Sequence, residues 1–204
     1  MTNIRPIIHI VDDDPSFRAA VAELLTAFDY RVALYESATL LLEKLPADEP
    51  GCILLDLQMS ELDGIQLQDK LTERQFGMPI VFVTGYGDIP TSVQAIKAGA
   101  EDFLTKPVPQ EKLFAAIERA IDRYHGLREH DNRIAGLRLL MSRLTPREHE
   151  VFVMLVHGLL NKQIAHALRT SERTIKFHRQ NIMKKVQVQS FPQLLLFCEV
   201  APFL

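Results

Sequence analysis

Five polar residues follow or close short apolar segments of this chain, and together they could carry out phosphoryl transfer. They are Asp12, Asp13, Asp56, Thr84 and Lys106. Three carboxylates in one place would repel one another, so a divalent cation is expected among them. One carboxylate could then be the nucleophile, while a hydroxyl and an ammonium group hold the phosphoryl oxygens. The set therefore indicates a site that binds a divalent cation and transfers a phosphoryl group to a carboxylate.

The apolar segments before these residues are predicted to be strands of a parallel sheet. Segments at 7–11, 31–35, 52–56, 80–84 and 102–105 alternate with segments whose apolar residues recur at helical spacing. Such alternation predicts an α/β fold with helices on both faces of the sheet. The carboxyl ends of parallel strands meet at one edge, where open α/β folds build their sites. The polar residues at these strand ends should therefore converge.

The distribution of charge divides the chain of 204 residues into an acidic and a basic part. Its net charge of −3 combines +5 for residues 142–204 with −8 for the residues before them. The acidic part suits a cation and a phosphoryl donor, and the basic part suits a polyanion. The alternative is a solvated excess of charge without a partner, and charge alone does not decide between the two.

Cysteine spacing and hydropathy argue against several classes of protein. Cys52 and Cys198 lack the spacing of a metal site, and we expect reduced structural thiols. The start MTNIRPIIHIV leads straight into a strand and an acidic cluster, unlike a signal peptide. No apolar run approaches the ~18–20 residues of a membrane span. We therefore expect a cytoplasmic protein without a membrane partner.

The basic part contains the start and stop signals of a helix-turn-helix unit. Thr145 and Glu148 form a capping box, and Gly158 is a suitable glycine for the end of that first helix. A short helix at 162–168 and a longer helix at 172–186 should follow. A helix, a tight turn and a second helix are the arrangement of a helix-turn-helix.

Residues 124–141 are charged and contain no proline, which predicts a helical linker between the two parts. Five residues at a spacing of seven hint at the seam of a coiled coil. They are Leu113, Ala120, Leu127, Ile134 and Met141. Asp131 and Arg138 interrupt the second stripe that such a seam needs. The sequence leaves two interpretations open, a dimer seam and a lone surface helix.

The motifs of the first part resemble the receiver domain of bacterial two-component response regulators. The resemblance rests on IVDDD, LLDLQMSELDGIQL and VFVTGYGDIPTSVQAIKAGAEDFLTKP, and on the spacing between them. It covers residues 1–123. It implies a flavodoxin-like (βα)5 domain with strand order 2-1-3-4-5 and a cis peptide bond between Lys106 and Pro107.

The resemblance also implies a role for each polar residue. Asp56 is the expected phosphoacceptor, with a sensor histidine kinase as phosphoryl donor. The expected ligands of Mg²⁺ are Asp12, Asp13, Asp56 and the backbone carbonyl of Gln58. The residues expected to contact the phosphoryl group, or to change conformation with it, are Thr84, Phe103 and Lys106. Glu61 adds a negative charge near the site entrance, where many relatives have glycine.

The segment LTPREHEVFVMLVHGLLNKQIAHALRTSERTIKFHRQNIMKKV closely resembles the LuxR-type DNA-binding domain, which is joined to receivers in the NarL/FixJ family. The resemblance covers residues 142–204, an all-α domain with a last helix capped by Ser190. It implies that the helix at 172–186 enters the major groove of double-stranded DNA. Leu160 stands where the motif usually has serine, which weakens one helix cap. The residues expected near DNA are Thr174, Lys176, Phe177, His178, Arg179, Gln180, Lys184 and Lys185.

These resemblances imply a transcription regulator whose DNA binding is controlled by phosphorylation. Its only reactions would be the Mg²⁺-dependent phosphorylation of Asp56 and a slow dephosphorylation. We expect the phosphorylated form to be a homodimer on an operator, with RNA polymerase as a further partner.

Two alternatives stay open. An aspartyl-phosphate hydrolase could use Asp12 and Asp14, although it leaves Asp56 and the second domain unexplained. The second alternative is a DNA binder whose affinity for DNA does not depend on phosphorylation. The complete pocket argues against it.

Overall fold

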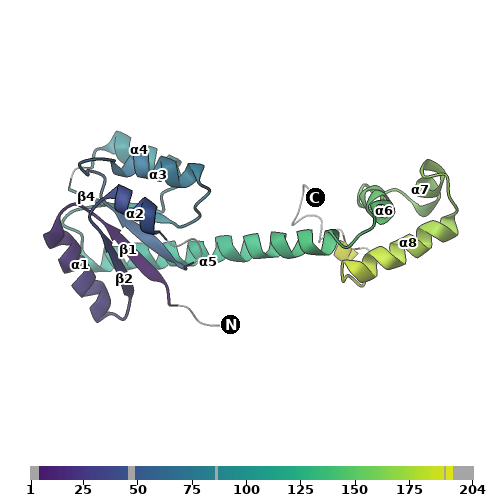
Figure 1. The fold of residues 1–204 in the computed structure, drawn as a ribbon, viewed down its shortest axis with the longest axis horizontal. Helices are drawn as coiled ribbons and strands as arrows, with labels where there is room; N and C mark the ends of the chain where they lie inside the picture. The colour runs from purple at the N-terminus through teal and green to yellow at the C-terminus, as the bar shows by residue number, and fades with distance from the viewer. Residues whose placement is uncertain (1–4, 46–48, 86, 191, 195–204) are drawn as a thin grey trace. The chain divides into compact units, whose positions relative to one another are not determined.

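The chain folds into two compact units, Met1–Arg128 and Glu129–Leu204. A computed structural model describes residues 5–45, 49–85, 87–190 and 192–194. The first unit alternates strands with helices, and the described part of the second is helical (Figure 1). The predicted α/β first part and all-α second part are therefore confirmed.

Within the described residues, five parallel strands form the sheet of the first unit. They are β1 (Ile7–Val11), β2 (Arg31–Tyr35), β3 (Gly51–Leu55), β4 (Ile80–Thr84) and β5 (Asp102–Thr105). Their order is β2-β1-β3-β4-β5, as predicted. Val11 in β1 is opposite Tyr35 on one side and Leu55 on the other. The order of connection reverses between β1 and β3, which is where open α/β sheets form a crevice for ligands.

The central strands are continuous apolar runs because both of their faces are covered. Every residue of β1, β3 and β4 is buried. Helix α1 (Pro15–Ala27) and the first part of α5 (Gln110–Met141) cover one face of the sheet. Helices α2 (Ala38–Lys44), α3 (Gly64–Glu73) and α4 (Ile89–Lys97) cover the other (Figure 1).

Side-chain caps fix where the helices after β1 to β4 begin. Asp14 caps α1, Ser37 caps α2, Asp63 caps α3 and Asp88 caps α4, each by accepting a hydrogen bond from a backbone N–H two or three residues further on. Each cap sets the first turn of its helix at the carboxyl edge of the sheet. The caps thereby also fix the loops that surround the candidate site.

Helix α5 is one continuous helix over the predicted fifth helix and the predicted linker. Leu113 and Ala120 are buried in the core of the first unit, and Met141 is buried in the core of the second. Three of the five residues spaced by seven are therefore apolar because they pack in the core of their own unit. Leu127, which is 43% exposed, and the half-buried Ile134 are the positions that remain for a seam.

The second unit contains α6 (Pro146–Val156), α7 (Asn161–Ala167) and α8 (Glu172–Lys185), which pack around one apolar core. The predicted capping box of Thr145 and Glu148 is present, and Gly158 follows α6 with a φ of 80°. The side chain of Leu160 provides no cap for α7, as predicted. Gln163 Oε1 instead accepts a hydrogen bond of 2.7 Å from the backbone N–H of Leu160.

The remaining predictions concern the cysteines, the last helix and membrane spans, and the described residues test some of them. Cys52 is a buried free thiol. Cys198 and most of the last predicted helix, which begins at Ser190, lie outside the described residues. In the part of the chain that the structure describes, no helix combines the length and the apolar character that crossing a lipid bilayer requires.

Candidate functional site

Polar side chains from four strand ends meet at the carboxyl edge of the sheet. Asp12 and Asp13 follow β1, Asp56 follows β3, Thr84 closes β4 and Lys106 follows β5. Carboxylate oxygens of the three aspartates lie within 4.8 Å of one another. The predicted convergence of these residues is therefore observed.

Lys106 connects two of the carboxylates. Its Nζ donates a hydrogen bond of 2.6 Å to Asp12 Oδ2 and one of 3.2 Å to Asp56 Oδ2. The same Nζ lies 4.0 Å from the centroid of the Phe17 ring, and the bond from Lys106 to Pro107 is cis, as predicted. Phe17 belongs to α1 and packs against the core of the first unit. Its contact with Lys106 joins α1 to the residue after β5, and helical spacing within α1 does not reveal such a contact.

The three aspartates differ in exposure, and this difference shapes the charge of the site. Asp12 is 1% exposed and Asp56 is buried, whereas Asp13 is exposed. Burial raises the pKa of Asp12, and the hydrogen bonds from Lys106 and from the backbone N–H of Asp14 offset this only in part. Burial alone would lower the pKa of Lys106, but its hydrogen bond to Asp12 and the charge of Asp56 raise it. The pocket thus favours positive charge beside Asp12.

The donor set fits a hard divalent cation. All the candidate ligand atoms are oxygens, which Mg²⁺ prefers, and Mg²⁺ usually keeps several waters. The exposed side of Asp13 and an open cleft of about 880 Å³ leave room for these waters. Asp56, Gln58, Thr84 and Lys106 also line the cleft. A phosphoryl donor can therefore reach Asp56 from solvent.

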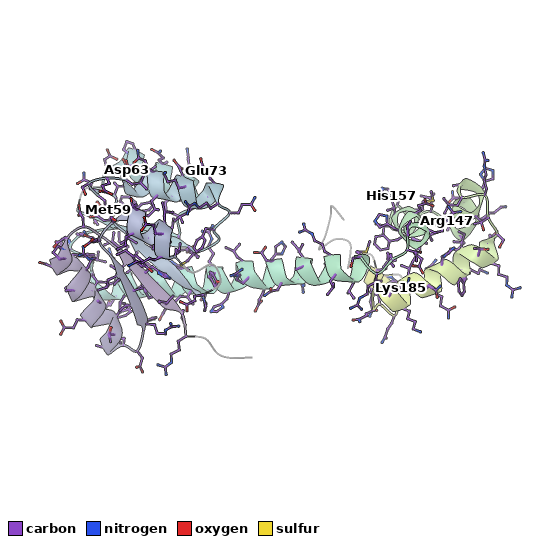
Figure 2. The ribbon with its side chains drawn as sticks, viewed as in Figure 1. Met59, Asp63, Glu73, Arg147, His157 and Lys185 are labelled. Atoms are coloured by element: carbon purple, nitrogen blue, oxygen red, sulfur yellow. The ribbon has the colours of Figure 1, made fainter. Side chains whose placement is uncertain are left out.

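The loop from β3 to α3 holds Asp56 in place. The backbone N–H of Gln58 donates a hydrogen bond of 3.4 Å to Asp56 Oδ1. At Gly64 a Cβ atom would lie 2.6 Å from the backbone oxygen of Asp56, so a glycine is needed for α3 to begin this close to β3. Met59 and Asp63 belong to this loop and line the cleft (Figure 2).

The two residues predicted to switch lie on neighbouring strands. Thr84 is fully buried at the end of β4 and also lines the cleft. The ring of Phe103 in β5 is half-buried, 6.0 Å from that of Phe82. At Gly87, in the loop after Thr84, a Cβ atom would lie 2.7 Å from the Phe103 ring. The loop that follows Thr84 therefore rests on Phe103.

Asp14 does not complete a second carboxylate pair with Asp12. Its Oδ1 accepts a hydrogen bond of 2.8 Å from the backbone N–H of Ser16 and caps α1. The hydrolase alternative requires a free carboxylate two residues after Asp12. This geometry argues against that alternative.

The opposite faces of α8 have opposite chemical character. Ile175 and Ile182 are fully buried and face the core of the second unit. Four exposed residues share the outer face because they are separated by three or four positions. They are Arg173, Phe177, Gln180 and Lys184. Arg173 was not among the residues predicted near DNA, although its place four residues before Phe177 could have identified it.

The eight residues predicted near DNA divide into two groups by exposure. Lys176, Phe177, Gln180 and Lys184 are exposed. Thr174, His178, Arg179 and Lys185 are half-buried at the flanks of the helix. The structure thus leaves four of the candidates exposed on α8 and four only partly exposed.

Two polar contacts join the helices of the second unit. Lys185 Nζ donates a hydrogen bond of 2.6 Å to Glu148 Oε2, which links α8 to the start of α6. Arg147 donates to the backbone oxygen of Leu168, at the end of α7 (Figure 2). Burial alone would raise the pKa of Glu148, but hydrogen bonds from Lys185 and Thr145 hold it below its usual value. The first contact therefore ties the end of α8 to α6, and the second ties α6 to the end of α7.

Comparison with known families decides what kind of protein carries this site. The model of the response regulator receiver domain matches residues 8–118. The model of the bacterial regulatory proteins of the luxR family matches residues 142–198. The chain belongs to the response regulators with a LuxR-type DNA-binding domain.

Full-length relatives share both parts of this response regulator. The response regulator protein TmoT of Ectopseudomonas mendocina is 40% identical over 98% of this chain and 90% of its own length. The transcriptional regulatory protein FixJ of Bradyrhizobium diazoefficiens is 37% identical over 92% of both chains. The solved structure of the response regulator StyR has a TM-score of 0.84 at 40% identity, over 96% of this chain and 98% of StyR. Full-length FixJ from B. japonicum has a TM-score of 0.60 at 35% identity, over 99% and 100% of the two chains.

Proposed function

We propose that phosphorylation of Asp56 controls the DNA binding of this response regulator. The observation that carries the proposal is the position of Lys106 Nζ, 3.2 Å from Asp56 and 2.6 Å from Asp12, beside an open cleft. A carboxylate that a phosphoryl donor can reach, with an ammonium group already beside it, is the arrangement that an in-line phosphoryl transfer needs. A sensor histidine kinase is the proposed donor in the cell.

In this mechanism Asp56 attacks the phosphorus atom, and the bond between phosphorus and the leaving group breaks on the opposite side. Lys106 moves its hydrogen bond from Asp56 to a phosphoryl oxygen and neutralises part of its charge. The hydroxyl of Thr84 donates to a second phosphoryl oxygen. Mg²⁺, held by Asp12, Asp13, Asp56 and the carbonyl of Gln58, supplies further charge neutralisation when bound.

The signal then passes to the loop after Thr84. Movement of Thr84 towards the phosphoryl group shifts this loop, and the Phe103 ring on which the loop rests must change its position with it. Since Phe103 lies in β5, the strand that contacts α4, the surface of α4 and β5 changes as a result. Dimerisation, or release of the second unit, follows from that change and favours binding to paired half-sites.

The proposed DNA-binding element is α8, which lies in the major groove. Its outer face carries Arg173 and Lys184, and the net charge of +5 for residues 142–204 suits a polyanion. The domain boundaries proposed for this arrangement are 1–123, 124–141 and 142–204. RNA polymerase is a proposed further partner at the promoter.

The proposal is tested by phosphorylating the full-length protein with acetyl phosphate and Mg²⁺. Intact-mass measurement should detect one added phosphoryl group that is stable in acid and labile in base. Asp56→Asn should abolish it, because an amide is a poor nucleophile. Asp63→Asn is the matched control, since Asp63 lines the same cleft and asparagine also caps helices. Full labelling of Asp56→Asn at another residue would exclude Asp56 as the acceptor.

A further inference from the structure

A large apolar side chain lies exposed on α8. Phe177 is 60% exposed, although a phenylalanine on a small domain would gain from burial. It lies two residues after the fully buried Ile175, so on the helix its side chain points away from the core of the second unit. Its ring centroid is 6.2 Å from that of the neighbouring His178. The ring therefore has no structural role in the apolar core.

The surroundings of Phe177 indicate what covers the ring. Arg173 lies one helical turn before it and Lys184 two turns after it on the same exposed face, with Gln180 between. Along the helix axis, Arg173 thus lies about 6 Å before Phe177, and Lys184 lies about 10 Å after it. An apolar protein surface is not complementary to a ring that lies between two cations. A polyanion with an isolated apolar group is complementary to both the ring and the cations.

Double-stranded DNA has such a group in its major groove. The base edges there present hydrogen-bond donors and acceptors, and the C5-methyl group of thymine is the apolar exception. Phenylalanine has no donor or acceptor, so its ring against a polar base edge would leave that edge without partners, which is unfavourable. Against a thymine methyl group, the same ring removes apolar surface from water on both sides.

We propose that Phe177 recognises thymine methyl groups in the major groove and makes this protein prefer thymine at the base pairs below the middle of α8. The inference rests on the proposed DNA-binding function and adds to it the group that one residue recognises. It also predicts a chemical equivalence. Because 5-methylcytosine carries its methyl group at the same place in the groove, it should partly replace thymine at those positions, whereas unmodified cytosine should not.

The experiment uses the phosphorylated full-length protein and a duplex that it selects from a random DNA library. The selected duplex is synthesised with thymine and, separately, with uracil at every thymine position, which removes only the methyl groups. Binding titrations should show that uracil weakens binding of the wild-type protein about fourfold for each methyl group contacted, equivalent to about 0.8 kcal/mol. Phe177→Ala should bind the two duplexes equally. Phe177→Leu should retain part of the preference, because leucine is still apolar.

A matched variant separates loss of the methyl contact from general weakening. Lys184→Ala lies on the same face and should weaken binding to both duplexes by one factor, so that the ratio of thymine to uracil affinities is unchanged. Phe177 is exposed, so its alanine variant should melt like the wild type; if it does not, Phe177→Leu provides the comparison.

Three results would overturn the inference. The first is equal binding of both duplexes by the wild-type protein. The second is a ratio of affinities that survives in Phe177→Ala. The third is tighter DNA binding by unphosphorylated Phe177→Ala with an unchanged ratio, which would mean that a protein surface covers the ring. If the wild-type protein selects no DNA at all, the proposed function itself fails, and this inference fails with it.

Discussion

Lys106 Nζ donates a hydrogen bond of 2.6 Å to the buried carboxylate of Asp12, 94 positions away in the chain. The contact places a positive charge beside Asp12. The Mg²⁺ of the proposed mechanism would bind to the same carboxylate. In the proposed mechanism, the ammonium group of Lys106 and a bound Mg²⁺ would therefore compete for Asp12 until the phosphoryl group provides Lys106 with another partner. This competition can be measured.

We expect Lys106→Met to bind Mg²⁺ more tightly than the wild-type protein, because the competing charge beside Asp12 is removed. Phosphorylation of Asp56 should nevertheless become slower, since the phosphoryl oxygens lose one of their neutralising groups. Calorimetric titration with Mg²⁺ and the rate of labelling by acetyl phosphate measure the two effects. Lys112→Met, on the exposed side of α5, controls for the change in net charge. Weaker Mg²⁺ binding in Lys106→Met than in this control would contradict the competition.

Asp13→Asn should weaken Mg²⁺ binding by more than about tenfold, because an amide oxygen carries no charge to offset the dehydration of the ion. Asp13 is exposed, so the free energy of unfolding without metal should change by less than about 0.5 kcal/mol. Glu23→Gln removes the same charge from an exposed position of α1 and should leave Mg²⁺ affinity unchanged. An affinity of Asp13→Asn equal to that of the control would place the cation elsewhere.

The buried His9 should make the first unit less stable as the pH falls. Burial lowers the pKa of His9 to about 4, and its Nδ1 lies 3.1 Å from the hydroxyl of Tyr35. In the unfolded chain the pKa is about 6.5. Between these values the unfolded state takes up a proton that the folded state cannot, so the free energy of unfolding falls from about pH 6.5 to about pH 4 by up to ~3 kcal/mol.

Denaturant titrations at several pH values measure this loss, with His9→Phe as the comparison. The ring is kept in His9→Phe, but the titrating group is removed, so the pH dependence between about 6.5 and 4 should become shallower. The same slope in both proteins would mean that His9 is protonated in the folded state as readily as in the unfolded state.

The ion pair of Glu148 and Lys185 should stabilise the second unit at neutral pH. Glu148→Gln leaves the half-buried Lys185 without its charged partner and should lower the free energy of unfolding by about 1–3 kcal/mol. Hydrogen bonds lower the pKa of Glu148 in the folded state. The advantage of the wild type is therefore complete above the unfolded value of about 4.3 and is lost as the pH falls through the folded value.

The matched control for this pair is Glu150→Gln. Glu150 forms an exposed pair with Arg147 in the same helix, and such pairs contribute at most about 1 kcal/mol. Thermal melting of both variants at neutral and at acidic pH provides the comparison. Equal melting of Glu148→Gln and Glu150→Gln at neutral pH would show that burial of Glu148 adds nothing.

The elements around the proposed phosphorylation site could be predicted because local signals coincide there. Each central strand is an apolar run that ends at a polar residue of the site, as Ile7–Val11 ends at Asp12. Each following helix starts at a capping side chain such as Asp14. These signals depend on neighbouring residues, so the sequence shows them directly. The role of Phe17 and the pairing of Lys106 with Asp12 depend on distant segments and became visible only in the fold.

The second unit shows what reasoning from one helix leaves out. Lys185 is basic and near the end of α8, so the sequence predicted it near DNA. Its partner Glu148 is 37 residues away and buried, and helical periodicity carries no information about it. Arg173 was not predicted near DNA, although it lies four residues before Phe177 and is exposed like it. The sequence did predict a helix for the linker at 124–141, and α5 continues into it from the fifth helix of the first unit without a break.

The most direct test of control by Asp56 is the affinity for DNA before and after phosphorylation. The dissociation constant for a selected operator duplex should be measured at one salt concentration for the wild-type protein and for Asp56→Asn, each with and without acetyl phosphate and Mg²⁺. We expect phosphorylation to tighten binding by the wild type by about 5–150-fold, which corresponds to a coupling free energy of about 1–3 kcal/mol, and to leave Asp56→Asn unchanged. Equal affinity of the phosphorylated and unphosphorylated wild type, or the same gain in Asp56→Asn, would contradict control of DNA binding through Asp56.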